Sequence, residues 1–176
     1  MRKAVLISIR PKWSEKIISG EKTIEVRKTR PKMNPPLKCY IYRSVQGGVI
    51  GEFVCDDIFE RVVRVGAICE PPKYCICDWN MDCTPLDTLL ADACLTKDEL
   101  EKYLDGGVGY GWHISNLRIY DTPRELREFY AVQNEVEVAL KAKPKPVTRP
   151  PQSWRYVEEE TCLLYTSDAA DEILGV

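Results

Sequence analysis

The sequence predicts an α+β domain in which mixed strands pack with a few short helices, and three features support this fold class. Short apolar runs rich in β-branched residues recur along the chain, the first at residues 5–9. Short stretches with helix-capping signals lie between several of these runs. The length of 176 residues suits one domain with a single core. We therefore expect one domain over residues 1–161, and residues 162–176 require a separate explanation.

The chain opens with a strand, a helix and a second strand. Residues 5–9 form the first strand, and Pro11 is a favourable first residue for the helix that follows. Helical spacing places Trp13, Ile17 and Ile18 on the inner side, and Gly20 is a stop signal. These signals predict a helix that ends before Gly20.

The second strand, at residues 23–28, has one polar face. Thr23, Glu25 and Arg27 alternate with Ile24 and Val26, so the two apolar side chains pack inward. The polar row is the first candidate for a functional surface.

The middle of the chain predicts a hairpin followed by weaker signals. Residues 38–42 and 49–55 read as two strands joined by a turn at Gln46-Gly47-Gly48. Residues 56–80 are mixed, with a valine-rich run at 62–65 that favours a further strand.

Two capped helices and two late strands complete the prediction. Thr84 with Pro85 opens one helix, and Thr96 with Glu99 forms a capping box for the next. Residues 112–120 alternate as one strand, and Pro123 begins a short helix. Residues 141–151 are basic, proline-rich and extended, and they lead into a last strand at 152–157.

The last fifteen residues do not resemble the rest of the chain. Residues 162–172 read Cys-Leu-Leu-Tyr-Thr-Ser-Asp-Ala-Ala-Asp-Glu and resemble, residue for residue, the translation of a transposase adapter used in sequencing libraries. We therefore expect residues 162–176 to be a non-native tail and the genuine C-terminus to be missing. The alternative is a natural, short, helix-prone tail.

Charge is distributed unevenly along the chain. Residues 1–43 hold twelve lysines and arginines against three acidic residues, whereas residues 52–105 hold five against thirteen. The formal net charge of -2 becomes +1 when the tail, with its three acidic residues, is left out. A basic first third predicts an anionic partner, and the alternative is an ordinary solvated surface.

The predicted location is the cytoplasm. No run of apolar residues is long enough to span a membrane, and Arg10 and Pro11 interrupt the first one before a signal-peptide core forms. The eight cysteines lack the spacing of a disulfide framework, so we expect reduced thiols.

Three segments carry a resemblance to a known family. Residues 7–11 (Ile-Ser-Ile-Arg-Pro), a helix, and then residues 20–27 (Gly-Glu-Lys-Thr-Ile-Glu-Val-Arg) resemble the opening of ASCH domains, where a GxKxxExR-like pattern follows the first helix. Residues 109–115 and 149–154 look like those of phage- and prophage-borne members from Gram-positive bacteria. With these segments near both ends of the chain, the resemblance extends over most of residues 4–157.

The resemblance implies a PUA-like fold, a small mixed β-barrel with short helices packed at its side. It also implies an RNA-binding or nucleotide-binding function in a polar cleft between barrel and helix. The residues expected at this cleft are Ser8, Arg10, Lys22, Glu25, Arg27, Ser153 and Trp154.

The chemistry of the first motif supports the same expectation. Lys22 suits a phosphate, Arg27 a phosphate or a base edge, and Glu25 a base amino group. The alternative is an internal ion pair in which Glu25 is held by Lys22 or Arg27. Six aromatic residues offer surfaces for base stacking or for core packing: Trp13, Tyr40, Tyr42, Trp112, Tyr120 and Trp154.

Two kinds of hydrolase are the enzymatic alternatives, with Lys22 and Glu25 as candidate catalytic residues. Some small ASCH proteins are amidohydrolases of acylated cytidine, which use a lysine in the first motif and a threonine three residues later. Here Glu25 occupies the threonine position, which makes this activity a poor fit. A ribonuclease would use Lys22, Glu25 and the single histidine, His113, although a structural role for His113 is the simpler interpretation.

Further alternatives concern metal and protein partners. The cysteines between Cys69 and Cys94 include a CxC but no paired CxxC, so we expect no metal and no cofactor, and a structural zinc site at these cysteines is the weaker alternative. A phage accessory protein that binds a host protein remains open, and the sequence says nothing about the oligomeric state.

Overall fold

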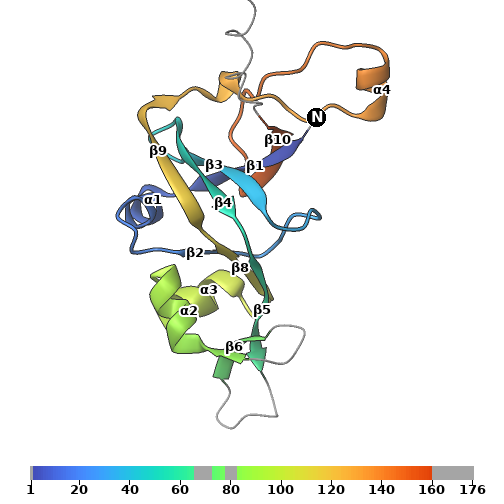
Figure 1. Cartoon of the computed structure of the whole chain (residues 1–176). Helices are drawn as coiled ribbons and strands as arrows, with labels where there is room; N and C mark the ends of the chain where they lie inside the picture. Colours follow the sequence, from blue (N-terminus) through green and yellow to red (C-terminus); the bar gives the residue numbers. More distant parts are fainter. Residues whose placement is uncertain (1, 66–72, 78–82, 160–176) are drawn as a thin grey trace, which may run out of the picture.

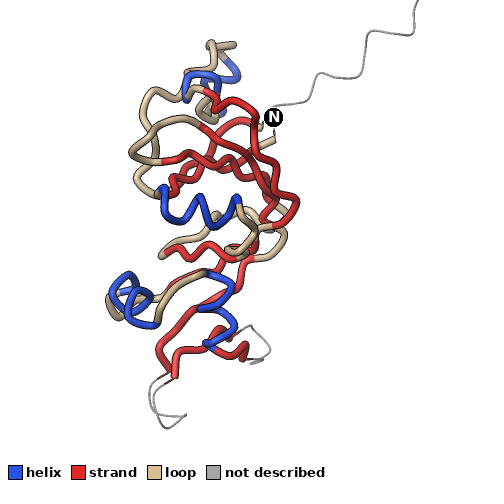
Figure 2. Tube along the Cα trace, turned by 90° about the vertical axis from the view of Figure 1, so that its left-hand side faces the viewer, coloured by secondary structure: helices blue, strands red, loops and turns tan. Residues whose placement is uncertain are grey.

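The computed structural model describes residues 2–65, 73–77 and 83–159 of the chain. Within these residues, two five-stranded sheets follow one another along the length of an elongated molecule (Figures 1 and 2). The predicted α+β class is correct.

The first sheet is built around the N-terminal strand. β1 (Lys3–Ile9) pairs antiparallel with β10 (Trp154–Glu158) and parallel with β3 (Leu37–Arg43). β3 pairs antiparallel with β4 (Val49–Cys55), as the predicted hairpin requires. β9 (Ser115–Arg124) completes the order β10-β1-β3-β4-β9.

The second sheet contains the strand with the polar motif. Its order is β2-β8-β5-β6-β7, and β2 (Ile24–Arg27) is an edge strand paired with β8 (Gly109–His113). The remaining strands are β5 (Ile58–Val65), β6 (Lys73–Cys77) and β7 (Cys83–Pro85). The valine-rich run therefore lies in a strand, as predicted.

The expectation of a closed barrel is wrong, because neither sheet closes on itself among the described strands. The chain instead passes directly from one sheet to the other, from β4 into β5 through Asp56 and Asp57 and from β8 into β9 through Ile114. No ladder pairs the edge strands β2 and β10, and Arg27 of β2 instead donates from Nη1 to Oγ of Ser153, the residue before β10, at 3.3 Å.

The passage through Ile114 also corrects the prediction of one strand over residues 112–120. The alternation is continuous in sequence, but the two halves pair in different sheets. Period-two alternation shows which side chains share a face and carries no information on where a strand changes sheet.

The helices follow their local signals with some differences. α1 (Pro11–Ile18) starts at the predicted proline, and Gly20 has φ +78, the conformation that glycine adopts most readily. Ile17 is buried, but Ile18 is 41% exposed and does not face inward as expected. α3 (Lys97–Leu104) begins at Thr96 with the predicted capping box.

The other helices begin later than predicted. α2 (Leu86–Ala93) starts after Thr84 and Pro85, which lie in β7. Pro123 lies in β9, and only a 3-10 turn, η1 (Leu126–Glu128), follows it. α4 (Glu135–Ala139) was not predicted, and it lies in a loop that projects from the first sheet (Figure 1).

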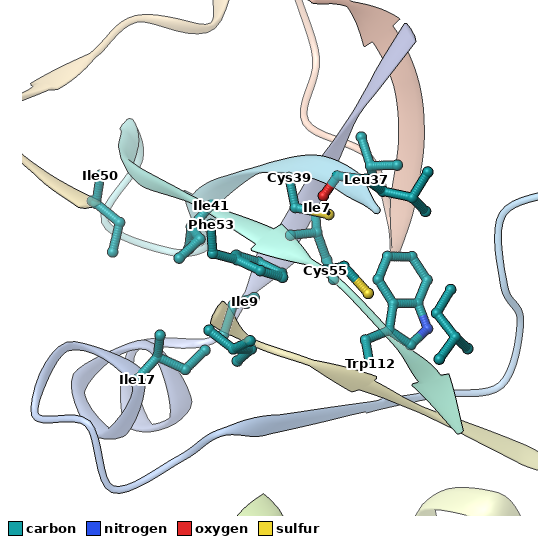
Figure 3. Close-up of a cluster of buried hydrophobic side chains, with 13 residues drawn as sticks. Ile7, Ile9, Ile17, Leu37, Cys39, Ile41, Ile50, Phe53, Cys55 and Trp112 are labelled. Carbon is teal, nitrogen blue, oxygen red and sulfur yellow. Dashed lines mark hydrogen bonds between the residues drawn. The ribbon is translucent and has the colours of Figure 1, made fainter. Parts of the chain in front are cut away.

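Buried apolar side chains hold the two sheets and the helices together. The largest cluster joins β1, α1, β3 and β4 to Trp112 of β8 (Figure 3). A second cluster packs Ile24 and Val26 of β2 against Leu89 and Leu100 of helices α2 and α3. The apolar face of β2 is therefore covered by helices α2 and α3, as its alternation predicted, and Glu25 and Arg27 lie on the other face.

Candidate functional site

A cleft of about 740 Å³ lies where the end of β1, β2, α1 and α3 meet the proline-rich segment before β10. We call it the β1–β2 cleft. Six of the seven residues expected at a binding site line it: Ser8, Arg10, Lys22, Glu25, Arg27 and Ser153.

The proline-rich segment is held at the cleft by Ser8. The backbone N–H of Ser8 donates to the carbonyl of Ser153 at 2.9 Å, and the Ser8 hydroxyl donates to the carbonyl of Pro151 at 2.6 Å. Proline lacks a backbone donor, so an extended segment such as 150–153 relies on contacts of this kind. Two parts of the chain that are far apart in sequence thus form one wall.

Lys22, Glu25 and Arg27 form a buried ion cluster on the cleft. Their exposed fractions are 3%, 6% and 8%. Glu25 Oε2 lies 3.3 Å from Lys22 Nζ, and Glu25 Oε1 lies 2.9 Å from Arg27 Nη2. The ion pairs of the structural alternative are therefore present, on residues that also line the cleft.

Lys22 is held by more than its carboxylate. Its Nζ donates to the carbonyl of Ala93 at 2.7 Å, at the end of α2, and lies 5.3 Å from the centre of the Trp13 ring. A buried ammonium needs partners on several sides to offset its desolvation. The lysine is thus fixed in place and ties β2 to helices α1 and α2.

Arg27 reaches the first sheet from the second. Its Nη2 donates to the carbonyl of Ser8 at 2.7 Å, in addition to its contacts with Glu25 and Ser153. Its Nε is buried and has no hydrogen-bond partner among the described residues. A buried donor without a partner costs free energy that a ligand acceptor or a water molecule can recover.

The charges around the cleft are mostly positive. The buried cluster has two cations for one carboxylate, and the exposed side chains of Arg10 and Lys102 add two more cations at its edge. Glu99 also lines the cleft, but it is paired with Lys12 at 2.8 Å, a contact that joins α3 to α1. The uncompensated charge favours a ligand that carries an anion.

Three aromatic side chains line the cleft, Trp13, Tyr42 and Tyr103. Trp154, the seventh expected residue, does not line it. Its ring packs 5.8 Å from that of Trp112, and its Nε1 donates to Thr29 Oγ1 at 3.0 Å. Tyr40 and Trp112 are fully buried, so base stacking on either of them is excluded.

Sequence reasoning missed Lys102 and Tyr103 of α3. Both lie on the exposed side of a capped helix, where lysine and tyrosine are ordinary surface residues, and no signal in the sequence separates them from their neighbours.

The structure separates His113 from the other candidate catalytic groups. His113 is not among the cleft-lining residues, and its Nδ1 lies 2.6 Å from Asp56 Oδ1 at the junction of the two sheets. The hydrogen bond from His113 lowers the pKa of Asp56 below its ordinary value. His113 thus has the partner that a structural histidine requires, and Thr23 does not line the cleft.

No group of three or more potential metal ligands occurs within the described part of the chain. Cys69 lies outside the described residues, as do the side chains of Cys75, Cys77 and Cys83, so the zinc alternative stays a prediction. The same holds for the adapter-like tail, of which residues 160–176 are not described. Among the described helices, each is too short or too polar to cross a membrane.

Comparisons with known proteins agree with this fold. The model of the ASCH domain family matches residues 7–173. The crystal structure of ASCH from Zymomonas mobilis is similar with a TM-score of 0.57 at 18% identity, over 89% of this chain and 88% of that chain. A tyrosine-to-phenylalanine mutant of that protein is similar with a TM-score of 0.56 at 19% identity, over 90% of this chain and 92% of that chain.

A serine-to-alanine mutant of the same protein gives a TM-score of 0.56 at 20% identity, over 90% of each chain. At these identities the similarity is one of fold. No match was found among curated protein sequences.

Proposed function

We propose that this chain, which belongs to the ASCH domain family, binds RNA or a nucleotide-like ligand in the β1–β2 cleft. The observation that carries the proposal is the buried cluster of Lys22, Glu25 and Arg27, which places two cations and one carboxylate on the cleft. A phosphate fits the remaining positive charge, and guanidinium groups bind phosphate through paired donors.

The cluster assigns different roles to its members. Each carboxylate oxygen of Glu25 already contacts a cation. The main role of Glu25 is therefore to orient Lys22 and Arg27, and binding a base amino group is secondary. The open side chains of Arg10 and Lys102 are free to move towards a ligand, and Trp13, Tyr42 and Tyr103 offer faces for stacking a base.

The test uses the exposed cations and not the buried ones. Lys22→Ala would leave Glu25 with one partner and disturb the fold, whereas Arg10→Ala and Lys102→Ala change exposed side chains. We expect each to weaken binding of a short single-stranded RNA by about fivefold, as for the loss of a charge-assisted contact. The slope of log affinity against log salt falls by about 0.7 for each lost phosphate contact.

Matched controls remove exposed cations that lie outside the cleft. Lys97→Ala removes a lysine of α3, the helix that also carries Lys102, and Arg127→Ala removes an exposed arginine. Neither residue lines the cleft. Absence of salt-sensitive RNA binding, or equal losses in cleft and control variants, contradicts the proposal. In that case the basic face as a binding surface for a host protein becomes the leading alternative.

Hydrolysis of RNA or of a nucleoside derivative is the second candidate function. It is favoured by the Lys22 ammonium and the Glu25 carboxylate, which lie 3.3 Å apart on the cleft, within reach of one substrate proton. Loss of full-length RNA during incubation, abolished in a folded Glu25→Gln variant, would support it. Cleavage that persists in that variant would point to a contaminating nuclease. The cytoplasmic location and prophage-type membership stay predictions.

A further inference from the structure

We propose that single-stranded RNA bound in the β1–β2 cleft continues along a basic surface loop into a second hollow at the opposite end of β1. This inference rests on the proposed function and extends it, because it assigns a path and a minimum length to the RNA. The loop comprises residues 28–34, and we call it the 28–34 loop.

The second hollow has a volume of about 690 Å³ and lies at the start of β1 and β3 and the end of β4. Its charged lining residues are Arg2, Lys3, Lys38, Glu52, Arg118 and Glu159. We call it the Arg118 hollow. It contains four cations against two carboxylates, so it has the same sign of charge as the β1–β2 cleft.

One of those carboxylates is already neutralised within the protein. Glu52 accepts the hydroxyl of Tyr120 at 2.7 Å and lies 3.2 Å from Lys38 Nζ. Arg118 is 73% exposed and lies only at the limit of ion-pair distance, 4.0 Å, from Glu52. Arg2, Lys3 and Arg118 therefore remain available to an external anion.

The 28–34 loop physically joins the two hollows. It starts directly after Arg27 in the cleft and reaches Met33 and Asn34, which line the Arg118 hollow (Figure 1). Between these points it is attached to β10, where Thr29 Oγ1 accepts from Trp154 Nε1 and the Lys32 N–H donates to the Tyr156 hydroxyl at 2.7 Å.

The register of β10 shows that the loop runs along β1. Trp154 pairs with Ile7, next to Ser8 in the cleft, and Tyr156 pairs with Val5, closer to Lys3 in the Arg118 hollow. Both aromatic contacts therefore fix the loop in an orientation that follows the strand from one hollow to the other.

The loop carries cations and no acidic residue. Its cations, Lys28, Arg30 and Lys32, occupy alternate positions from 28 to 32. Lys28 and Lys32 are exposed, and Lys28 Nζ lies 5.5 Å from the centre of the Tyr103 ring, which lines the cleft. The basic surface of the loop thus begins at the cleft itself.

The length of this path selects the ligand. Five residue steps separate Ser8 from Lys3, which at a strand rise of about 3.3 Å per residue gives roughly 17 Å. A mononucleotide does not span this distance, whereas a single strand of about four or more nucleotides does. Because regularly repeated backbone phosphates match a row of cations, the ligand class is a single-stranded oligonucleotide.

The experiment compares RNA length with loop substitutions in the full chain. A uridine dinucleotide and oligouridylates of about four to about twelve nucleotides are titrated onto the unaltered protein, Lys28→Ala/Lys32→Ala and Arg118→Ala. We expect affinity to rise with length, and each substitution to remove about two- to fivefold of that gain. The dinucleotide, which fits within the cleft, is expected to bind the unaltered protein and Arg118→Ala equally, because Arg118 lines the other hollow.

The matched control is Lys143→Ala/Arg127→Ala, which removes two exposed cations that line neither hollow. Dinucleotide binding without any gain for longer RNA overturns the path but leaves the proposed function intact. A length-dependent gain that survives in the loop and Arg118 variants also overturns it. Failure of every RNA to bind overturns both proposals.

Discussion

Glu25 Oε1 lies 2.9 Å from Nη2 of Arg27, two residues further along β2, and both side chains are buried. Because residues two apart in a strand share one face, the motif aligns its carboxylate and its guanidinium on the cleft side of β2. Lys22 joins them from just before the strand. This arrangement makes the cluster both a structural link and the charged part of the cleft.

Replacement of Glu25 by glutamine tests the structural role of the cluster. The change leaves Lys22 and Arg27 buried without a counter-charge, so we expect a loss of about 3–5 kcal/mol in the free energy of unfolding. Urea titration measures it. Glu21→Gln, which breaks an exposed pair with Lys16, is the control and is expected to change the stability far less. Equal losses would contradict the burial of the cluster.

Arg27→Lys keeps the charge but removes the planar fork. A lysine cannot contact Glu25, Ser8 and Ser153 together, so we expect a loss of about 1–3 kcal/mol in stability. Hydrogen exchange should also become faster at the Ser8 amide, which bonds to the Ser153 carbonyl. Arg155→Lys, which changes an exposed side chain of β10, is the control. Unchanged exchange at Ser8 would show that Arg27 does not link the two edge strands.

The contact between Asp56 and His113 predicts that the stability of the folded protein falls at acidic pH. The hydrogen bond from His113 lowers the pKa of Asp56 from its ordinary 3.8, so the folded state favours the ionised carboxylate. Its contribution to stability is complete above pH 3.8 and is lost as the pH falls through the lower pKa of the folded protein.

Asp56→Asn should therefore reduce the difference in stability between neutral pH and pH values below 3.8. Denaturant titrations across this range measure the effect. Asp57→Asn is the neighbouring control, since Asp57 is also exposed but the contact with His113 is made by Asp56. An identical acid dependence in both variants would contradict the assignment.

Two buried thiols should be unreactive in the folded protein. Burial raises the pKa of Cys55 to about 12 and that of Cys39 well above its ordinary value, so neither forms the thiolate that alkylating reagents require. Mass spectrometry after brief iodoacetamide treatment should show both unmodified, and both modified after unfolding. Cys94 is only half-buried and provides the comparison. Modification of Cys39 or Cys55 at the rate of Cys94 would contradict the packing of the core.

Local signals predicted local structure well. The capping box of Thr96 and Glu99, the stop at Gly20 and the hairpin of β3 and β4 each depend on residues close together in sequence. Pro123 shows the limit of such signals. It is a good helix start in isolation, yet it lies in β9, because pairing with β4 extends that strand past it.

By itself, the sequence determined the α+β class, the alternation that gives β2 an apolar and a polar face, and the basic character of the first third. These properties follow from side-chain type and from spacings of a few residues. The tertiary structure alone decided that residues 112–120 divide between two open sheets, that Lys22 reaches the carbonyl of Ala93, and that Lys102 and Tyr103 join the cleft. Each of these depends on contacts between residues far apart in the chain, whose burial and partners no local pattern specifies.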